Sequence, residues 1–200
     1  MRTACKAHEV PDWYIDSCQK IKYLFPRAHA TAYVMMAYRI AYCKVHYPLA
    51  YYAAYFSKRT EEFDANDVAK GQAFIKRKLD ELEDLADERK LDIKEGDLLA
   101  DYQVVYEYFL RGFTFERVNL YESAAEDFII KKNSLLMSLS SIPGVSPAAG
   151  RNIVAARKGG KFSSVEDLKS RAGLNKTSLA ALKSHGCLNG RSEEHTSELQ

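Results

Sequence analysis

The stretch Ile142-Pro143-Gly144-Val145-Ser146-Pro147 decides the fold of the last third of this chain. Proline favours the first position of a helix, and a serine just before it can accept a hydrogen bond from the free amides of the first turn. A helix is therefore predicted over residues 148–157. A second copy stands 29 residues further on, because Gly173 in Ala172-Gly173-Leu174-Asn175-Lys176 matches Gly144, and a second helix is predicted over 177–184.

This repeat resembles a tandem helix-hairpin-helix domain, in which residues 164–171 lead into the second copy and Ser163 or Ser164 caps them. Glycine lets the hairpin backbone approach a phosphate, and the following helix turns its free N–H groups toward the anion. Such contacts hold the DNA backbone and read no base sequence. We therefore predict duplex DNA binding without sequence specificity by Gly144, Val145, Ser146, Arg151, Gly173, Leu174, Asn175 and Lys176. A helical module for protein contacts is the alternative.

The distribution of charge supports a polyanionic partner. The net charge of the whole chain is only +2, but residues 1–60 carry +6, residues 61–130 carry −10 and residues 131–190 carry +8. The second basic block contains both hairpins, and Arg157, Lys158, Lys161 and Lys183 are expected to surround them. Basic blocks favour nucleic acid, whereas the acidic block between them is expected to face solvent or protein.

A second informative stretch, Ile21-Lys22-Tyr23-Leu24-Phe25-Pro26-Arg27-Ala28-His29-Ala30, places cations among aromatic residues ahead of a helix predicted over 29–46. Cations bind phosphate, and aromatic faces stack on bases or fill a core. The helical spacing of Tyr33, Met36, Ile40 and Cys43 predicts that one face of this helix packs inward. The alternative is a helix start with solvated basic residues.

Together with Trp13-Tyr14-Ile15-Asp16-Ser17-Cys18 and Lys44-Val45-His46-Tyr47-Pro48, this stretch resembles the fingers region of bacterial family C replicative DNA polymerases. The resemblance continues through Arg111-Gly112-Phe113 and Leu120-Tyr121-Glu122-Ser123. It implies that Lys22, Arg27 and His29 lie near the incoming nucleotide or the primer–template.

The resemblance further implies that the parent chain is a DNA-directed DNA polymerase, a nucleotidyltransferase, and that this chain is a C-terminal fragment of it. Phosphoryl transfer needs carboxylates that hold Mg²⁺, and in this family they lie in the palm, upstream of the fragment. The chain contains no Asp-x-Asp motif, so we expect no catalytic or metal-binding residue in it and no activity from it alone. The implied partners are primer–template DNA, a deoxynucleoside triphosphate and a sliding clamp, although the clamp-binding motif is expected to be missing.

The predicted fold class is mainly α: a helical fingers remnant, a small β element and a tandem helix-hairpin-helix domain. The expected parts are residues 1–112, with an acidic helical segment, a β connector at 113–137, and the DNA-binding domain at 138–190. Single helices are predicted over 12–20, 49–56, 64–90 and 97–110, a strand over 113–118, and a hairpin from the apolar runs 128–130 and 135–137. Residues 191–200 resemble a translated sequencing adapter and are excluded from this prediction.

Composition excludes several other classes. The four cysteines, Cys5, Cys18, Cys43 and Cys187, lack the spacing of zinc ligands and are predicted to be reduced thiols. No apolar stretch reaches the roughly 20 residues of a membrane span, and the first residues do not resemble a secretory signal. The expected location is the bacterial cytoplasm, at the nucleoid. A stand-alone helix-hairpin-helix DNA-binding protein without polymerase activity is the main alternative function, and a helical scaffold is the third.

Overall fold

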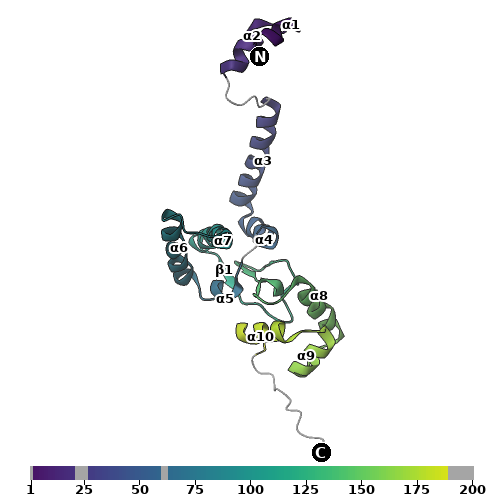
Figure 1. Cartoon of the computed structure of the whole chain (residues 1–200). Helices are drawn as coiled ribbons and strands as arrows, with labels where there is room; N and C mark the ends of the chain where they lie inside the picture. The colour runs from purple at the N-terminus through teal and green to yellow at the C-terminus, as the bar shows by residue number, and fades with distance from the viewer. Residues whose placement is uncertain (1, 21–26, 60–62, 189–200) are drawn as a thin grey trace, which may run out of the picture. The chain divides into compact units, whose positions relative to one another are not determined.

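The computed structural model describes residues 2–20, 27–59 and 63–188 (Figure 1). Its contacts divide the chain into two compact units, Met1–His46 and Tyr47–Gln200. Helices dominate both units, and the described strands form one small sheet, which confirms the predicted mainly α fold class. Lys22 and the adapter-like residues 191–200 lie outside the described residues.

The first unit contains helices α1 (Arg2–Ala7), α2 (Asp12–Lys20) and α3 (Arg27–His46). Helix α2 has the predicted bounds, and α3 begins two residues earlier than predicted, directly after Pro26. The prediction of a buried face on α3 is wrong for this structure, because the helix has no buried residue. Its apolar and aromatic side chains are distributed around the whole circumference of the helix. Tyr33, Met36 and Ile40 are all more than half exposed.

The second unit opens with α4 (Pro48–Lys58), α5 (Ala65–Val68), α6 (Gln72–Asp87) and α7 (Ile93–Leu110). The prediction of one helix over 64–90 is wrong, because the chain turns at Gly71, whose φ of +92° is outside the helical region. Helix α7 begins four residues before the predicted start. Asp92 and Glu95 form a reciprocal capping box there, in which each side chain accepts a backbone hydrogen bond from the other residue.

A three-stranded sheet joins these helices to the last part of the chain. Strands β2 (Ile129–Ile130) and β3 (Ser134–Leu136) form the predicted antiparallel hairpin. Strand β1 (Thr114–Glu116) pairs with β3 in parallel, which gives the order β1-β3-β2. The parallel pairing was not predicted, since the alternation of apolar residues defines a strand but not its partner.

The remaining elements are η1 (Leu139–Ser141), α8 (Pro147–Ala156), η2 (Arg157–Gly159), α9 (Val165–Ala172) and α10 (Lys176–His185). Helices α8, α9 and α10 match their predicted positions to within one or two residues. Ser164 caps α9 by accepting a hydrogen bond from the backbone N–H of Asp167 at 3.1 Å, which decides between the two predicted caps.

One continuous apolar core runs through the second unit. An aromatic cluster around Phe56, Tyr108 and Phe115 fills the space between α4, α7 and the sheet. The same core continues through Leu139 and Ile153 to Leu182 on α10. Because this core crosses positions 112 and 137 without interruption, the expected parts 113–137 and 138–190 share their packing with the helices before them.

Candidate nucleic-acid interface

The two predicted hairpins share a buried residue and a side-chain helix cap at equivalent positions. Val145 in hairpin 1 (residues 142–146) and Leu174 in hairpin 2 (residues 172–175) are both buried. Ser146 Oγ accepts from the backbone N–H three residues ahead at 3.2 Å, and Asn175 Oδ1 does the same at 2.8 Å. Asparagine thus performs at hairpin 2 the capping function of serine at hairpin 1, which leaves the remaining first-turn amides of α8 and α10 directed out of the helix.

Hairpin 1 packs against the last helix. Gly144 has a φ of +94°, and a Cβ built on it would lie 3.2 Å from Cβ of Ala181 and 3.6 Å from Cγ2 of Thr177. Its carbonyl oxygen accepts a hydrogen bond from the Ser178 hydroxyl at 2.9 Å. Glycine is therefore required at 144 by the close approach of α10, in addition to any contact with a ligand.

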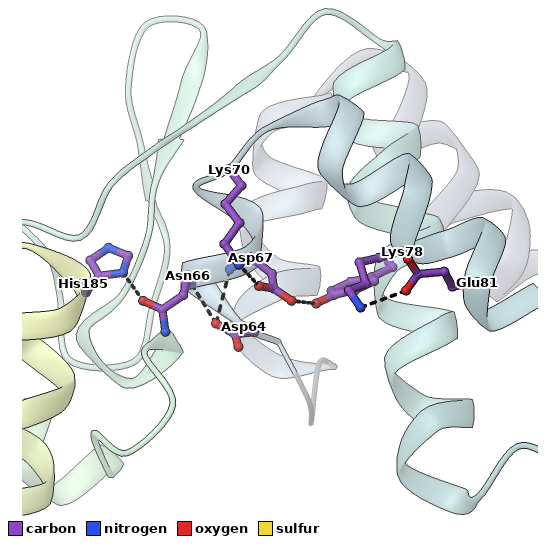
Figure 2. A network of polar contacts seen from close by, with 8 residues as sticks. Asp64, Asn66, Asp67, Lys70, Lys78, Glu81 and His185 are labelled. Carbon is purple, nitrogen blue, oxygen red and sulfur yellow. Dashed lines mark hydrogen bonds and ion pairs between the residues drawn. The ribbon is translucent and has the colours of Figure 1, made fainter.

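Carboxylates stand beside hairpin 1. An open groove is lined by Asp64, Asp67, Tyr102 and residues 142–146, among others. Asp64 caps α5, and Asp67 accepts from the Tyr102 hydroxyl at 2.9 Å and pairs with Lys70 at 2.7 Å (Figure 2). These carboxylates raise the electrostatic cost of placing a phosphate on the groove side of hairpin 1.

Hairpin 2 is more open. Gly173 adopts the left-handed conformation with φ +60°, and a Cβ there would meet nothing within 4 Å. Gly173, Asn175 and Lys176 are exposed, and Lys176 occupies the first position of α10. An anion at this helix start would meet free N–H groups, the positive end of the helix dipole and a lysine.

The basic residues of this region fall into two groups. Arg151 pairs with Glu126, and Arg157 donates to the carbonyl oxygens of Leu120 and Ser123 at 3.0 and 2.7 Å. These two bonds make Arg157 a structural group, although it was expected among the cations that surround the hairpins, and burial lowers its pKa. The second group consists of exposed lysines, namely Lys158, Lys161, Lys169, Lys176 and Lys183.

His185 is a buried residue that the sequence analysis did not single out. Its Nε2 accepts from the backbone N–H of Val118 at 3.3 Å, and its Nδ1 lies 2.8 Å from Oδ1 of Asn66 (Figure 2). These partners fix a neutral ring that donates from Nδ1. Burial and the nearby Arg117 hold the pKa of His185 below its usual value, against the opposing effect of Asp64. The ring thereby ties α10 to α5 and to the segment after β1.

The residues predicted near the nucleotide are not assembled into a site by the described part of the chain. Arg27 and His29 are exposed at the start of α3. The His29 ring contacts the Tyr33 ring at a centroid distance of 4.5 Å, and the Arg27 carbonyl oxygen accepts from the Thr31 hydroxyl at 2.9 Å. The proposed roles of Lys22, Arg27 and His29 stay predictions.

The described ranges are also informative about metal sites, disulfides and membrane-spanning helices. No group of three or more His, Cys, Asp or Glu side chains in those ranges is placed to hold a metal ion. All four cysteines lie within these ranges, and none of them forms a disulfide. Within the same ranges, none of the helices combines the length and apolarity that crossing a membrane requires.

Comparison with known proteins agrees with this geometry. Residues 112–197 match the family described as helix-hairpin-helix motif. The chain is 49% identical over 185 residues to DNA polymerase III PolC-type of Bacillus subtilis and 45% identical over 190 residues to that of Oceanobacillus iheyensis. The enzyme of Clostridium perfringens is 46% identical over 186 residues. The alignments cover 92–95% of this chain but only 13% of each polymerase. The chain is therefore homologous to a region of PolC-type DNA polymerase III, which confirms the resemblance to that family.

Proposed function

We propose that this chain is a DNA-binding segment of a replicative polymerase and that its helix-hairpin-helix region holds the backbone of duplex DNA. The observation that carries the proposal is the start of α10, where Asn175 caps the helix and Gly173 and Lys176 are exposed. It lies in a segment, residues 131–190, that carries a net charge of +8.

Hairpin 1 contributes less to this binding than hairpin 2. Gly144 is in close contact with α10, Arg151 is paired with Glu126, and Asp64 and Asp67 line the adjacent groove. Hairpin 2 is more open, because nothing lies within 4 Å of a Cβ built on Gly173. The expected result is an unequal pair of phosphate contacts, with the positions of both set by the shared core.

The proposal also includes the activity of the parent polymerase, which depends on residues outside those that the structure describes. The parent transfers nucleotides to primer–template DNA with Mg²⁺ and a deoxynucleoside triphosphate, and it binds a sliding clamp. In that setting Lys22, Arg27 and His29 contribute positive charge near the triphosphate or the primer–template. The proposed functional parts stay 1–112, 113–137 and 138–190, and the chain alone is expected to extend no primer.

Binding of the full chain to a fluorescein-labelled random-sequence duplex, measured by anisotropy at several salt concentrations, tests the proposal. We expect binding that weakens steeply with salt and is equal for unrelated sequences, because counterion release dominates phosphate contacts. Lys176→Ala should reduce the slope of log K against log salt by about 1. Lys132→Ala, an exposed lysine on the β2–β3 turn, is the matched control. Absence of DNA binding, or a slope unchanged by Lys176→Ala, would contradict the assignment.

A further inference from the structure

Arg171, in the last turn of α9, holds the loop that connects α8 to α9. Its guanidinium donates to the carbonyl oxygens of Ala156 at 2.6 Å, Gly160 at 3.1 Å and Lys161 at 3.3 Å. It also pairs with Asp167 at 3.2 Å and lies 4.6 Å from the centroid of the Phe162 ring. A planar group with several N–H donors can satisfy such divergent acceptors, whereas an ammonium cannot.

The other end of the same loop is held by a second arginine. Arg157 donates to two carbonyl oxygens of the segment after β1, and Phe162 N–H donates to the Tyr121 hydroxyl at 3.0 Å. Both guanidinium groups are thus engaged by backbone carbonyl oxygens. Between them, Lys158 and Lys161 are exposed on a loop whose carbonyl oxygens are turned inward to Arg171.

Arg171 connects this loop to the last turn of α9, which hairpin 2 follows in the sequence. The Arg171 guanidinium contacts the loop directly, and Arg171 precedes Gly173 by only two residues, or at most about 7.6 Å of chain between Cα atoms. Loop 157–161 and hairpin 2 are therefore linked through the last turn of α9, and exposed lysines, namely Lys158, Lys161 and Lys176, form their charged surface. Asp167 balances the charge of Arg171, so the net positive charge of this surface resides on its lysines.

We propose that Lys158 and Lys161 form a further contact with DNA phosphates, in addition to that of hairpin 2, and that Arg171 is the positioning residue that holds their loop in place. The proposal rests on the proposed DNA-binding function. The partner is the phosphate backbone of duplex DNA. A lysine on an anchored loop loses less conformational entropy on binding than one on a free loop, so the anchor increases affinity without touching the DNA.

The test uses the full chain, the random-sequence duplex and the salt titration described above. Lys158→Ala/Lys161→Ala should lower the salt slope by about 2, because each lost phosphate contact removes about 0.9. Lys90→Ala/Lys132→Ala, a pair of exposed lysines outside both hairpins, is the matched control and should leave the slope unchanged. Arg171→Ala should weaken DNA binding at a fixed salt concentration, and the two lysine substitutions added to it should weaken binding further by less than half of their separate effect.

The outcomes separate this proposal from the one on which it rests. If the unaltered chain binds DNA but Lys158→Ala/Lys161→Ala leaves the slope unchanged, the additional contact is refuted and the DNA-binding function stands. If the unaltered chain does not bind, both fail. Fully additive effects of Arg171→Ala and the lysine pair would refute the positioning role. Should Arg171→Ala not fold, Arg171→Lys provides the same comparison, since it keeps the charge but cannot reach all three carbonyl oxygens.

Discussion

The hydroxyl of Ser178 on α10 donates a hydrogen bond to the carbonyl oxygen of Gly144 at 2.9 Å and thereby joins the first hairpin to the helix that follows the second. The repeat places Ala149 at the position equivalent to Ser178, 29 residues earlier, so the reciprocal bond from α8 to Gly173 cannot form. The two copies share their caps and core positions but differ in this contact. Hairpin 1 is consequently attached to α10, whereas hairpin 2 is exposed.

We expect Gly144→Ala to lower the free energy of unfolding by about 2–4 kcal/mol, because positive φ and contact with Ala181 act together. Gly173→Ala has only the conformational cost, about 1–2 kcal/mol, because nothing lies within 4 Å of its Cβ position. Urea denaturation of both variants measures the difference. Equal losses would show that α10 does not approach hairpin 1 this closely.

Ser178→Ala should lower the free energy of unfolding by about 1–2 kcal/mol, because the buried hydroxyl leaves the Gly144 carbonyl oxygen without this donor. Ser184→Ala, at an exposed position on the same helix, should change stability by less than about 0.5 kcal/mol. Thermal unfolding followed by circular dichroism distinguishes the two variants, and a loss at Ser184 matching that at Ser178 would argue against the bond.

Stability should fall as the pH decreases below the normal pKa of histidine, about 6.5. The pKa of His185 is lowered in the folded chain by burial and by Arg117. Unfolded chains therefore bind this proton more readily, and the stabilisation present above pH 6.5 is lost progressively toward the lower folded pKa. One group contributes a slope of at most about 1.4 kcal/mol per pH unit.

His185→Gln is the variant that assigns this pH dependence. Urea denaturation between pH 7.5 and 5 should give a flatter profile for His185→Gln than for the unaltered chain. His29→Gln, at an exposed position, should retain the original profile. A profile unchanged by His185→Gln would mean that the ring does not stay neutral between Val118 and Asn66.

Arg157→Ala should destabilise the fold by about 2 kcal/mol, because two buried carbonyl oxygens lose a charged donor. Arg151→Ala breaks an exposed ion pair with Glu126 and should change stability by less than about 1 kcal/mol. Chemical denaturation measures both changes. Equal, small losses of stability for both variants would mean that Arg157 is an exposed cation without a structural role.

Local sequence rules determined the helix starts and the repeat. Ser146, Ser164 and Asn175 are caps because each side chain can reach an amide two or three residues ahead, which needs no distant partner. The same reasoning failed at Gly71, where helical periodicity continued across a residue that turns the chain. It also failed for α3, since apolar residues on every side of a helix do not specify which face becomes buried.

Contacts between residues distant in the sequence were decided by the tertiary structure alone. In the sequence, Arg157, Arg171 and the lysines around them are all simply basic residues. Only the folded structure shows that the two guanidinium groups bind carbonyl oxygens, whereas the ammonium groups of the lysines face solvent. The parallel pairing of β1 with β3 and the neutral ring of His185 likewise depend on segments 20 to 119 residues apart. A sequence pattern records the spacing of neighbours along a helix or strand, whereas burial and hydrogen-bond partners depend on which segments meet in space.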